Sequence, residues 1–214
     1  MKKHLCLVLT MVCCISTAIG AQLKFNLGPI PYTFQNFGFI LAGLLLPPKW
    51  AFTSQALCLL LIVIGLPVAS GFRGGPYVLI GYTAGYLWMF PIAALLMSTL
   101  TRLYTGTSRR SLDTIDLKDY SVLLLLSLIA AIPVYIVGFL VFYAYTLMPG
   151  FRGLYEWSEL VVNRFLGMGI NNPFIICLIA SILIFIPQDL FMDHAIAIAT
   201  AKALYSILKA RGLV

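Results

Sequence analysis

The sequence predicts an all-α polytopic membrane protein, a bundle of six transmembrane helices formed by one domain that covers residues 1–214. The chain is 61% hydrophobic and only 10% charged, whereas soluble domains carry about 25% charged residues. Charge-free runs recur along it, and each can supply the roughly 20 residues that cross a bilayer. The basic residues lie between these runs, which explains the net charge of +7 without a nucleic-acid partner.

The first expected helix covers residues 5–21 and also has the pattern of a secretory signal. Its basic start, apolar middle and small-residue ending are typical of such a signal. Because the following chain is itself multi-spanning, we expect the segment to be retained as the first helix of the bundle. Its pairs Cys14/Ala18 and Thr17/Ala21 have the spacing that lets two helices approach closely.

Five more helices are expected in the later apolar runs, over residues 33–47, 52–66, 77–100, 120–147 and 188–208. Pro91 and Pro133 should kink the fourth and fifth helices, which neighbouring helices can accommodate. Pro187 should end the apolar stretch 173–186, which is too short to span by itself. We expect a half-helix or an interfacial helix over that stretch.

The basic residues also predict the orientation of the bundle in the cell (inner or plasma) membrane. With both termini in the cytoplasm, ten of the 14 Lys and Arg residues lie inside, as the positive-inside rule requires. Three irregular segments, 28–31, 65–75 and 187–189, then meet at the outer face. We expect a ligand pocket that opens there to the exterior.

Two polar residues follow the Pro-rich segment 28–31 directly. Thr33 and Gln35 carry a hydroxyl and an amide into the first turns of a charge-free helix, after prolines that hold the loop rigid. This arrangement can build a ligand site. The alternative is a turn whose polar residues only cap the helix.

Acids within apolar segments are the other functional candidates, because a charge in the bilayer is unfavourable. Asp189 either serves a ligand or is an anion stabilised in the first turn of a helix. Asp193 and the adjacent His194 can serve proton transfer, form a satisfied polar pair or face water. Tyr82 and Tyr86 share a helix face, where packing or lipid contact is the alternative to a ligand platform.

Signatures of an enzyme are missing from the sequence. It has no GxxxxGK[ST] phosphate loop, no HExxH and no GxSxG. The five cysteines lie in apolar runs without metal-ligand spacing. We therefore expect no catalytic residue, no cofactor and no metal, and the lipid bilayer as a partner.

Several motifs stand in a fixed order along the chain. They are Pro29-Ile-Pro-Tyr-Thr-Phe-Gln35, Leu41-Ala-Gly-Leu-Leu-Leu46, Gly65-Leu-Pro67, Gly71-Phe-Arg-Gly-Gly75, Gly81-Tyr-Thr-Ala-Gly-Tyr86 and Phe185-Ile-Pro-Gln-Asp189. In this order the sequence resembles the BioY family, the biotin-binding S components of energy-coupling-factor vitamin transporters. The resemblance is dense over residues 21–90, weak over 100–170 and moderate over 183–205.

The resemblance implies a protein that captures biotin in an outward-facing pocket. It implies two kinds of partner, a transmembrane energy-coupling subunit and two ABC-type ATPases. Together with the reading of the residues themselves, it leads us to expect that the substrate-binding residues are Thr33, Gln35, Arg73, Gly74, Tyr82, Tyr86 and Asp189. Small residues on helix 1 dock the coupling subunit in such families, here Cys14, Ala18 and Ala21. Internal helix packing is the alternative for these three.

Three departures from the family pattern lie on the ligand side. Met192 stands where the family has a lysine, Arg73 where it often has a small polar residue such as Asn, and Tyr82 where it has a proline. We expect Arg73 to take over recognition of the biotin carboxylate, because its planar fork can form two charge-assisted hydrogen bonds. The alternative is an arginine solvated at the lipid headgroups.

Other functions stay open from the sequence. The ligand can be a related vitamin or a biotin precursor. The chain can also be a proton-coupled secondary carrier that uses Asp189, Asp193 and His194, or a structural membrane protein without a ligand.

Overall fold

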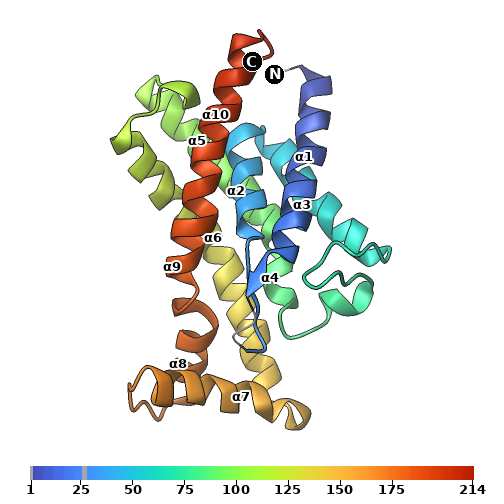
Figure 1. Cartoon of the computed structure of the whole chain (residues 1–214), viewed down its shortest axis with the longest axis vertical. Helices are drawn as coiled ribbons and strands as arrows, with labels where there is room; N and C mark the ends of the chain where they lie inside the picture. The colour runs from blue at the N-terminus through green and yellow to red at the C-terminus, as the bar shows by residue number, and fades with distance from the viewer. Residues whose placement is uncertain (1, 26–27) are drawn as a thin grey trace.

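The computed structural model describes residues 2–25 and 28–214, and most of these residues lie in helices (Figure 1). The α-helices are α1 (Lys3–Gln22), α2 (Asn36–Leu45), α3 (Pro48–Val63), α4 (Ala84–Trp88), α5 (Phe90–Ser108), α6 (Leu117–Thr146), α7 (Arg152–Glu159), α8 (Pro173–Leu178), α9 (Ile186–Gln188) and α10 (Ala195–Ala210). Shorter 3₁₀ or π-helical turns are η1 (Pro76–Leu79), η2 (Leu112–Thr114), η3 (Pro149–Phe151), η4 (Leu160–Phe165), η5 (Ile179–Leu183) and η6 (Asp189–His194). The strands β1 (Lys24–Phe25) and β2 (Tyr32–Thr33) pair antiparallel. The mostly helical architecture that the sequence predicts is confirmed.

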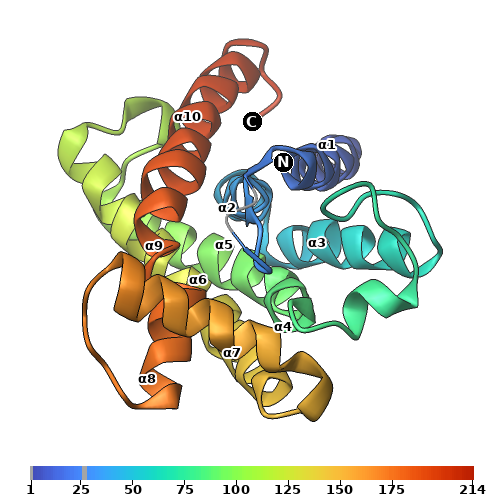
Figure 2. The ribbon, with the colours of Figure 1, turned by 60° about the horizontal axis from the view of Figure 1, so that its bottom comes forward.

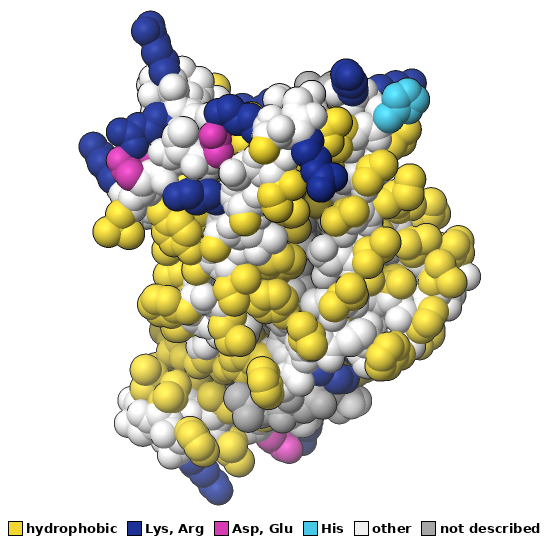
Figure 3. All heavy atoms as spheres, turned by 45° about the horizontal axis from the view of Figure 1, so that its top comes forward, with side chains coloured by type: hydrophobic (Ala, Val, Ile, Leu, Met, Phe, Trp, Pro, Cys, Tyr) yellow, Lys and Arg dark blue, Asp and Glu magenta, His cyan; other side chains and the backbone are white. Residues whose placement is uncertain are grey.

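Both termini lie at one end of the molecule, which we call the terminal end, and α7 lies across the opposite end (Figure 1). Hydrophobic side chains cover much of the visible side surface, while Lys and Arg side chains gather at the terminal end (Figure 3). Three helical runs, Lys3–Gln22, Leu117–Thr146 and Pro173–Ala210, are long and apolar enough to cross a membrane. This distribution is typical of a protein surrounded by lipid. Six spans and cytoplasmic termini stay predictions.

Helix α2 lies at the centre of the bundle, with α1, α3, α5 and α10 around it (Figure 2). All its residues from Gly38 to Leu45 are buried, as expected for a helix that is apolar on every face. Two glycines let α1 and α2 approach. A Cβ atom on Gly38 would lie 1.9 Å from Thr17 Oγ1, and one on Gly20 would lie 2.1 Å from the Phe34 carbonyl oxygen. These two contacts hold the start of α2 close against α1.

Two expected helices differ from the prediction, one in its first residue and one in its continuity. Helix α2 begins at Asn36 rather than at residue 33, because Tyr32 and Thr33 pair with β1. The expected helix 77–100 is divided into a 3₁₀ turn, α4 and α5. A single turn residue, Met89, separates α4 from α5. Pro91 lies in the first turn of α5, where proline fits without losing a hydrogen bond.

The last part of the chain is interrupted close to the predicted position. Helical turns fill most of residues Pro173–Ala210, but they stop at Leu183, and Ile184 and Phe185 form a turn before α9 begins at Ile186 with Pro187 in its first turn. Two π-helical turns, Ile179–Leu183 and Asp189–His194, flank the proline. Such wider turns change the backbone hydrogen-bond register, so the run absorbs a residue that has no N–H to donate.

Candidate functional site

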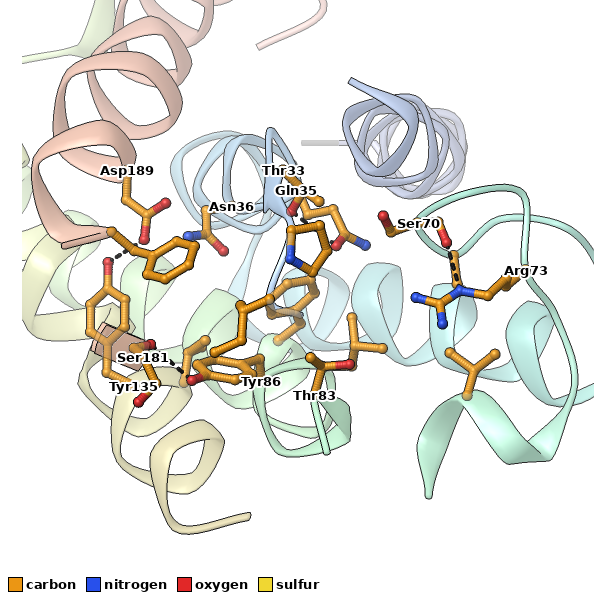
Figure 4. A pocket seen from close by; sticks show the side chains of 18 residues that line it. Thr33, Gln35, Asn36, Ser70, Arg73, Thr83, Tyr86, Tyr135, Ser181 and Asp189 are labelled. Carbon is orange, nitrogen blue, oxygen red and sulfur yellow. Dashed lines mark hydrogen bonds between the residues drawn. The ribbon is translucent and has the colours of Figure 1, made fainter. Parts of the chain in front are cut away.

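A cavity of about 770 Å³, measured with its open mouth, lies between the start of α2, the loop after α3, α4, α6 and the helical run 173–210 (Figure 4). Its polar lining residues are Thr33, Gln35, Asn36, Ser70, Arg73, Thr83, Tyr86, Tyr135, Ser181 and Asp189. Ile30, Pro31, Ala69, Val78, Leu87, Phe90, Val134 and Phe185 complete the wall.

Asp189 lies at one end of the cavity and is only 5% exposed. The Tyr135 hydroxyl of α6 donates a hydrogen bond of 2.8 Å to its Oδ2 atom. The Asn36 amide, in the first turn of α2, points toward the same carboxylate (Figure 4). Three elements that are distant in sequence therefore present an acid, a hydroxyl and an amide to one place.

Arg73 lies at the opposite end of the cavity from Asp189 (Figure 4) and is exposed. Its Nε atom donates a hydrogen bond of 2.9 Å to the Ser70 carbonyl, which leaves both terminal NH₂ groups of the guanidinium for other partners. In the described part of the chain, Arg73 has no carboxylate within salt-bridge distance, and the buried Ser70 Oγ has no hydrogen-bond partner. This end of the cavity offers hydrogen-bond donors to an anion.

The loop that carries Arg73 is held to the bundle by one side chain at the end of α1. Gln22 donates from Nε2 to the Ala69 carbonyl at 3.0 Å and accepts from the Phe72 N–H at 2.9 Å. Gly71 has a φ of 74°, in the left-handed region that glycine adopts easily. The tight turn returns the chain so that Ala69 and Arg73 pair as a β-bridge. The position of Arg73 is therefore set by hydrogen bonds to the backbone of its own loop.

The wall between the two ends is mainly apolar, with a few fixed polar groups. Phe185 stacks on Tyr32 with ring centroids 4.1 Å apart. The Tyr86 hydroxyl donates to the Ser181 carbonyl at 2.9 Å. Thr33 donates to Gln35 Oε1 at 3.2 Å, which leaves the Gln35 NH₂ group available to a ligand. The cavity therefore suits an elongated molecule with an apolar middle, a polar end and an anionic end.

The structure brings five of the seven predicted substrate-binding residues together. Thr33, Gln35, Arg73, Tyr86 and Asp189 line the cavity, although their contact with a ligand stays a prediction. Gly74 and Tyr82 are not among its lining residues. Gly74 lies where its backbone meets that of Gly65 and Leu66, and a Cβ atom would come 2.3 Å from the Leu66 carbonyl oxygen. Tyr82 donates to the Pro29 carbonyl at 3.0 Å and packs among aromatic rings.

Sequence reasoning missed five polar residues of the lining. They are Asn36, Ser70, Thr83, Tyr135 and Ser181. Asn36 directly follows the Gln35 motif, and Ser70 lies in the glycine-rich loop, so proximity to these motifs could have indicated both. Tyr135 and Ser181 are single polar residues within apolar helices, where the sequence gives no local sign of which helix face meets the cavity.

Two other groups of candidates lie outside the cavity. Cys14 and Ala21 of α1 are buried in the bundle and Ala18 is half-buried, which agrees better with internal helix packing than with an exposed docking face.

Asp193 and His194 are fully buried. His194 Nδ1 lies 2.8 Å from Ser127 Oγ, and Gln188 donates to Asp193 Oδ1 at 3.4 Å.

Met192 is 42% exposed and is not among the lining residues of the cavity. The position at which the sequence resemblance leads us to expect a lysine therefore does not line the cavity in this structure. Within the described ranges, no group of three His, Cys, Asp or Glu residues could hold a metal ion. The chemistry that the cavity supports is the binding of a small molecule.

Comparisons with known proteins identify relatives of the chain. A sequence profile of the BioY family matches residues 2–210. A protein of Pyrococcus horikoshii described as a probable biotin transporter BioY is 47% identical over 77 residues, which cover 36% of this chain and 48% of that protein. A probable biotin transporter BioY of Bacillus subtilis is 43% identical over 90 residues, 39% of this chain and 48% of that protein. These matches span about half the length of the curated relatives.

A solved structure has the same fold over nearly the whole chain. It is a crystal structure of the S-component for biotin from an ECF-type ABC transporter. The TM-score is 0.72 at 23% sequence identity, and the superposition covers 95% of this chain and 94% of that one. The likeness shows that the two chains share their helical architecture.

Proposed function

The chain belongs to the BioY family, and from this premise we propose that it is the substrate-binding membrane subunit of a biotin uptake transporter. One observation supports this function above the others. The cavity has a buried acid with amide and hydroxyl neighbours at one end, an apolar middle, and a free guanidinium at the other end. Biotin has the same order of groups, with a cyclic urea, an apolar ring and chain, and a carboxylate.

In this proposal the urea of biotin binds at the Asp189 end. One of its N–H groups can donate to the Asp189 carboxylate, and its carbonyl can accept from the Asn36 amide, since the Tyr135 hydroxyl already donates to Asp189. A ligand that supplies these bonds offsets the unfavourable burial of the carboxylate. The aliphatic chain would follow the wall formed by Phe90, Phe185 and neighbouring residues, where apolar burial contributes about 25 cal/mol per Å².

The carboxylate of biotin would bind at the mouth of the cavity. Arg73 can give two parallel hydrogen bonds to it from the NH₂ groups that Ser70 does not use. The Ser70 hydroxyl, which has no partner in the described chain, can add a third. The exposed position of Arg73 keeps the cost of desolvating this ion pair small.

We further propose that the cavity opens to the exterior and that uptake is driven by a transmembrane energy-coupling subunit and ABC-type ATPases in the cell membrane. The partners follow from the family, and the absence of a phosphate-loop motif from this sequence is consistent with ATP hydrolysis on another chain. Uptake of labelled biotin in cells with and without such an ATPase module tests this part.

Titration of purified protein with biotin tests the binding function directly. We expect saturable binding in the micromolar range or tighter, measured by calorimetry in detergent. Desthiobiotin and lipoic acid, added as competitors, would identify a precursor or a related vitamin as the better ligand. A protein that binds none of the three saturably would contradict the proposed function.

A proton-coupled carrier is the second candidate. Its support is the fully buried pair Asp193 and His194, which lies two turns or less from Asp189 on the same helical run. Uptake that continues without the ATPases but stops when the proton gradient is dissipated would favour the carrier. Uptake with the opposite dependence would exclude it.

A further inference from the structure

A second cavity opens at the terminal end of the molecule, and we call it the terminal groove. It lies between the α2–α3 junction, the end of α5 with the loop that follows, and α10. Its volume is about 1170 Å³, measured with its open mouth. Its lining residues are Leu44, Leu45, Pro47, Thr101, Arg102, Thr105, Gly106, Arg109, Arg110, Ser111, Leu112, Tyr205 and Val214. None of these residues lines the binding cavity.

Three arginines line the terminal groove. The three acids near it pair with Arg110 or with Lys209, and none pairs with Arg102 or Arg109. Arg110 binds Asp116 and lies 2.6 Å from Asp119 Oδ2. Lys209 lies 2.7 Å from Asp113 Oδ2. Over residues 2–25 and 28–214, the other two arginines of the groove, at positions 102 and 109, have no carboxylate partner. The groove therefore carries two arginines that form no ion pair among the described residues.

The three acids cannot turn to the free arginines without losing their present partners. The Asp119 backbone N–H and the Arg110 guanidinium lower the pKa of Asp116, and the Lys209 ammonium lowers the pKa of Asp113. Both acids are therefore ionised and engaged at neutral pH. An anion from outside the chain is the natural partner for the remaining positive charge.

A buried hydroxyl without a partner lies beside the arginines. Thr101 is 3% exposed and lines the groove, and its Oγ1 atom has no hydrogen-bond partner among the described residues. Two other threonines of the same helix donate to the carbonyl four residues earlier, Thr99 to Leu95 and Thr107 to Leu103, each at 2.9 Å. Threonines in helices ordinarily satisfy their hydroxyls in this way. The free hydroxyl of Thr101 is available to an acceptor in the groove.

The other wall of the groove is apolar. Leu44, Leu45 and Leu112 are buried and line it. The groove lies at the terminal end, and Figure 3 shows Lys and Arg side chains gathered at this end, next to the hydrophobic sides of the molecule. A phosphate group is a strong acceptor for an arginine fork, and an apolar chain beside the phosphate would match the leucine wall. These two features occur together in an anionic phospholipid.

We propose that the terminal groove binds the phosphate group of an anionic phospholipid through Arg102, Arg109 and the Thr101 hydroxyl. The leucine wall then contacts the first part of an acyl chain. Inorganic phosphate presents the same charged group without the chain, so a comparison of the two distinguishes a lipid site from a free-phosphate site.

Calorimetry on the full chain in neutral detergent tests this, with three probes: dioctanoyl phosphatidylglycerol, dioctanoyl phosphatidylcholine and inorganic phosphate. We expect phosphatidylglycerol to bind at least tenfold more tightly than either of the others. The variant R102Q/R109Q should bind it about tenfold or more weakly, since a tenfold change corresponds to about 1.4 kcal/mol. T101V should weaken binding about threefold.

The matched control is K118Q/R211Q, which removes two exposed basic residues of the terminal end that do not line the groove. Its affinity for phosphatidylglycerol should stay within about twofold of wild type, and the thermal unfolding midpoint of every variant should match wild type. An equal loss in this control would show diffuse charge attraction and overturn the proposal. Equal affinity for phosphatidylcholine, or for inorganic phosphate, would overturn it as well.

Discussion

At the residue scale, the two ends of the cavity between Asp189 and Arg73 differ in how their charged side chains are held. Asp189 is buried, and a tyrosine and an asparagine from two other elements surround it. Arg73 is exposed and tied by one nitrogen to a backbone carbonyl of its own loop. A change at Asp189 therefore disturbs its contacts with Tyr135 and Asn36. A change at Arg73 mainly removes a group that a ligand can contact.

Asp189→Asn should weaken biotin binding at least tenfold, about 1.4 kcal/mol. The substitution keeps the shape of the side chain but replaces one acceptor oxygen by a donor, which faces the Tyr135 hydroxyl and the ligand. Calorimetric titration of the detergent-purified variant measures this. Asp113→Asn, at the terminal end and outside the cavity, is the control. Unchanged affinity in Asp189→Asn would mean that the acid serves only the helix.

Arg73→Gln should remove the preference of the protein for biotin over biotin methyl ester. Wild type should prefer the acid by about tenfold, because the ester cannot accept two charge-assisted hydrogen bonds from the guanidinium. Arg152→Gln, a substitution of another exposed arginine that lies outside the cavity, should keep the preference. The hypothesis is wrong if wild type binds both compounds equally or if Arg73→Gln still prefers the acid.

The sequence indicated part of this site because its polar residues lie in recognisable local motifs. Gln35 follows a proline pair, and Arg73 is the basic residue of a glycine-rich loop. Tyr135 could not be predicted in the same way. It becomes a site residue only because α6 turns that face toward Asp189, and tertiary packing, not local sequence, decides which face that is.

At the element scale, glycine contacts decide where the polar start of α2 lies. The close approach of α1 at Gly20 and Gly38 places the segment 33–36 at the cavity. The sequence predicted this crowding only in part, through the small residues of helix 1. It predicted an interruption near Pro187, and the helical turns do stop at Leu183 and begin again at Ile186, but it could not predict the π-helical turns on either side of the proline.

Gly38→Ala should destabilise the protein by about 1–3 kcal/mol, the usual cost of overpacking. The added Cβ would lie 1.9 Å from Thr17 Oγ1, and this hydroxyl also donates to Gln55 Oε1 at 3.0 Å. All five cysteines are buried, so a thiol-reactive fluorescent dye reports thermal unfolding in detergent. Gly106→Ala is the matched control, because its Cβ meets no atom within 4 Å. Equal unfolding midpoints for the two variants would contradict the packing argument.

At the scale of the whole molecule, the basic residues at the terminal end and the exposed Arg73 should lie on opposite sides of the membrane. The terminal end carries both chain ends and a concentration of Lys and Arg (Figures 1 and 3). The positive-inside rule places such an end in the cytoplasm. The sequence could predict this arrangement because it depends only on the order of apolar runs and charges, not on packing.

A single cysteine at position 73 should be labelled from outside intact cells by a membrane-impermeant maleimide, and one at position 109 should not. Both are introduced into a background in which the five native cysteines are replaced. Labelling after permeabilisation controls for the reactivity of each site. Labelling of position 109 but not of position 73 in intact cells would invert the topology, and the outward-facing cavity would be wrong with it.

The hydroxyl of Ser70, buried at the mouth of the cavity and given no partner by the described chain, links ligand capture to the folding equilibrium. A buried polar group without a hydrogen bond costs about 1–3 kcal/mol, and a ligand that accepts from it returns part of that free energy to the folded state alone. If biotin binds as proposed, thermodynamic linkage raises the free energy of unfolding by about 2.7 kcal/mol at 100 times the Kd. Under that proposal the ligand supplies a hydrogen bond that the fold lacks, and cells with little biotin would hold a less stable population of this protein.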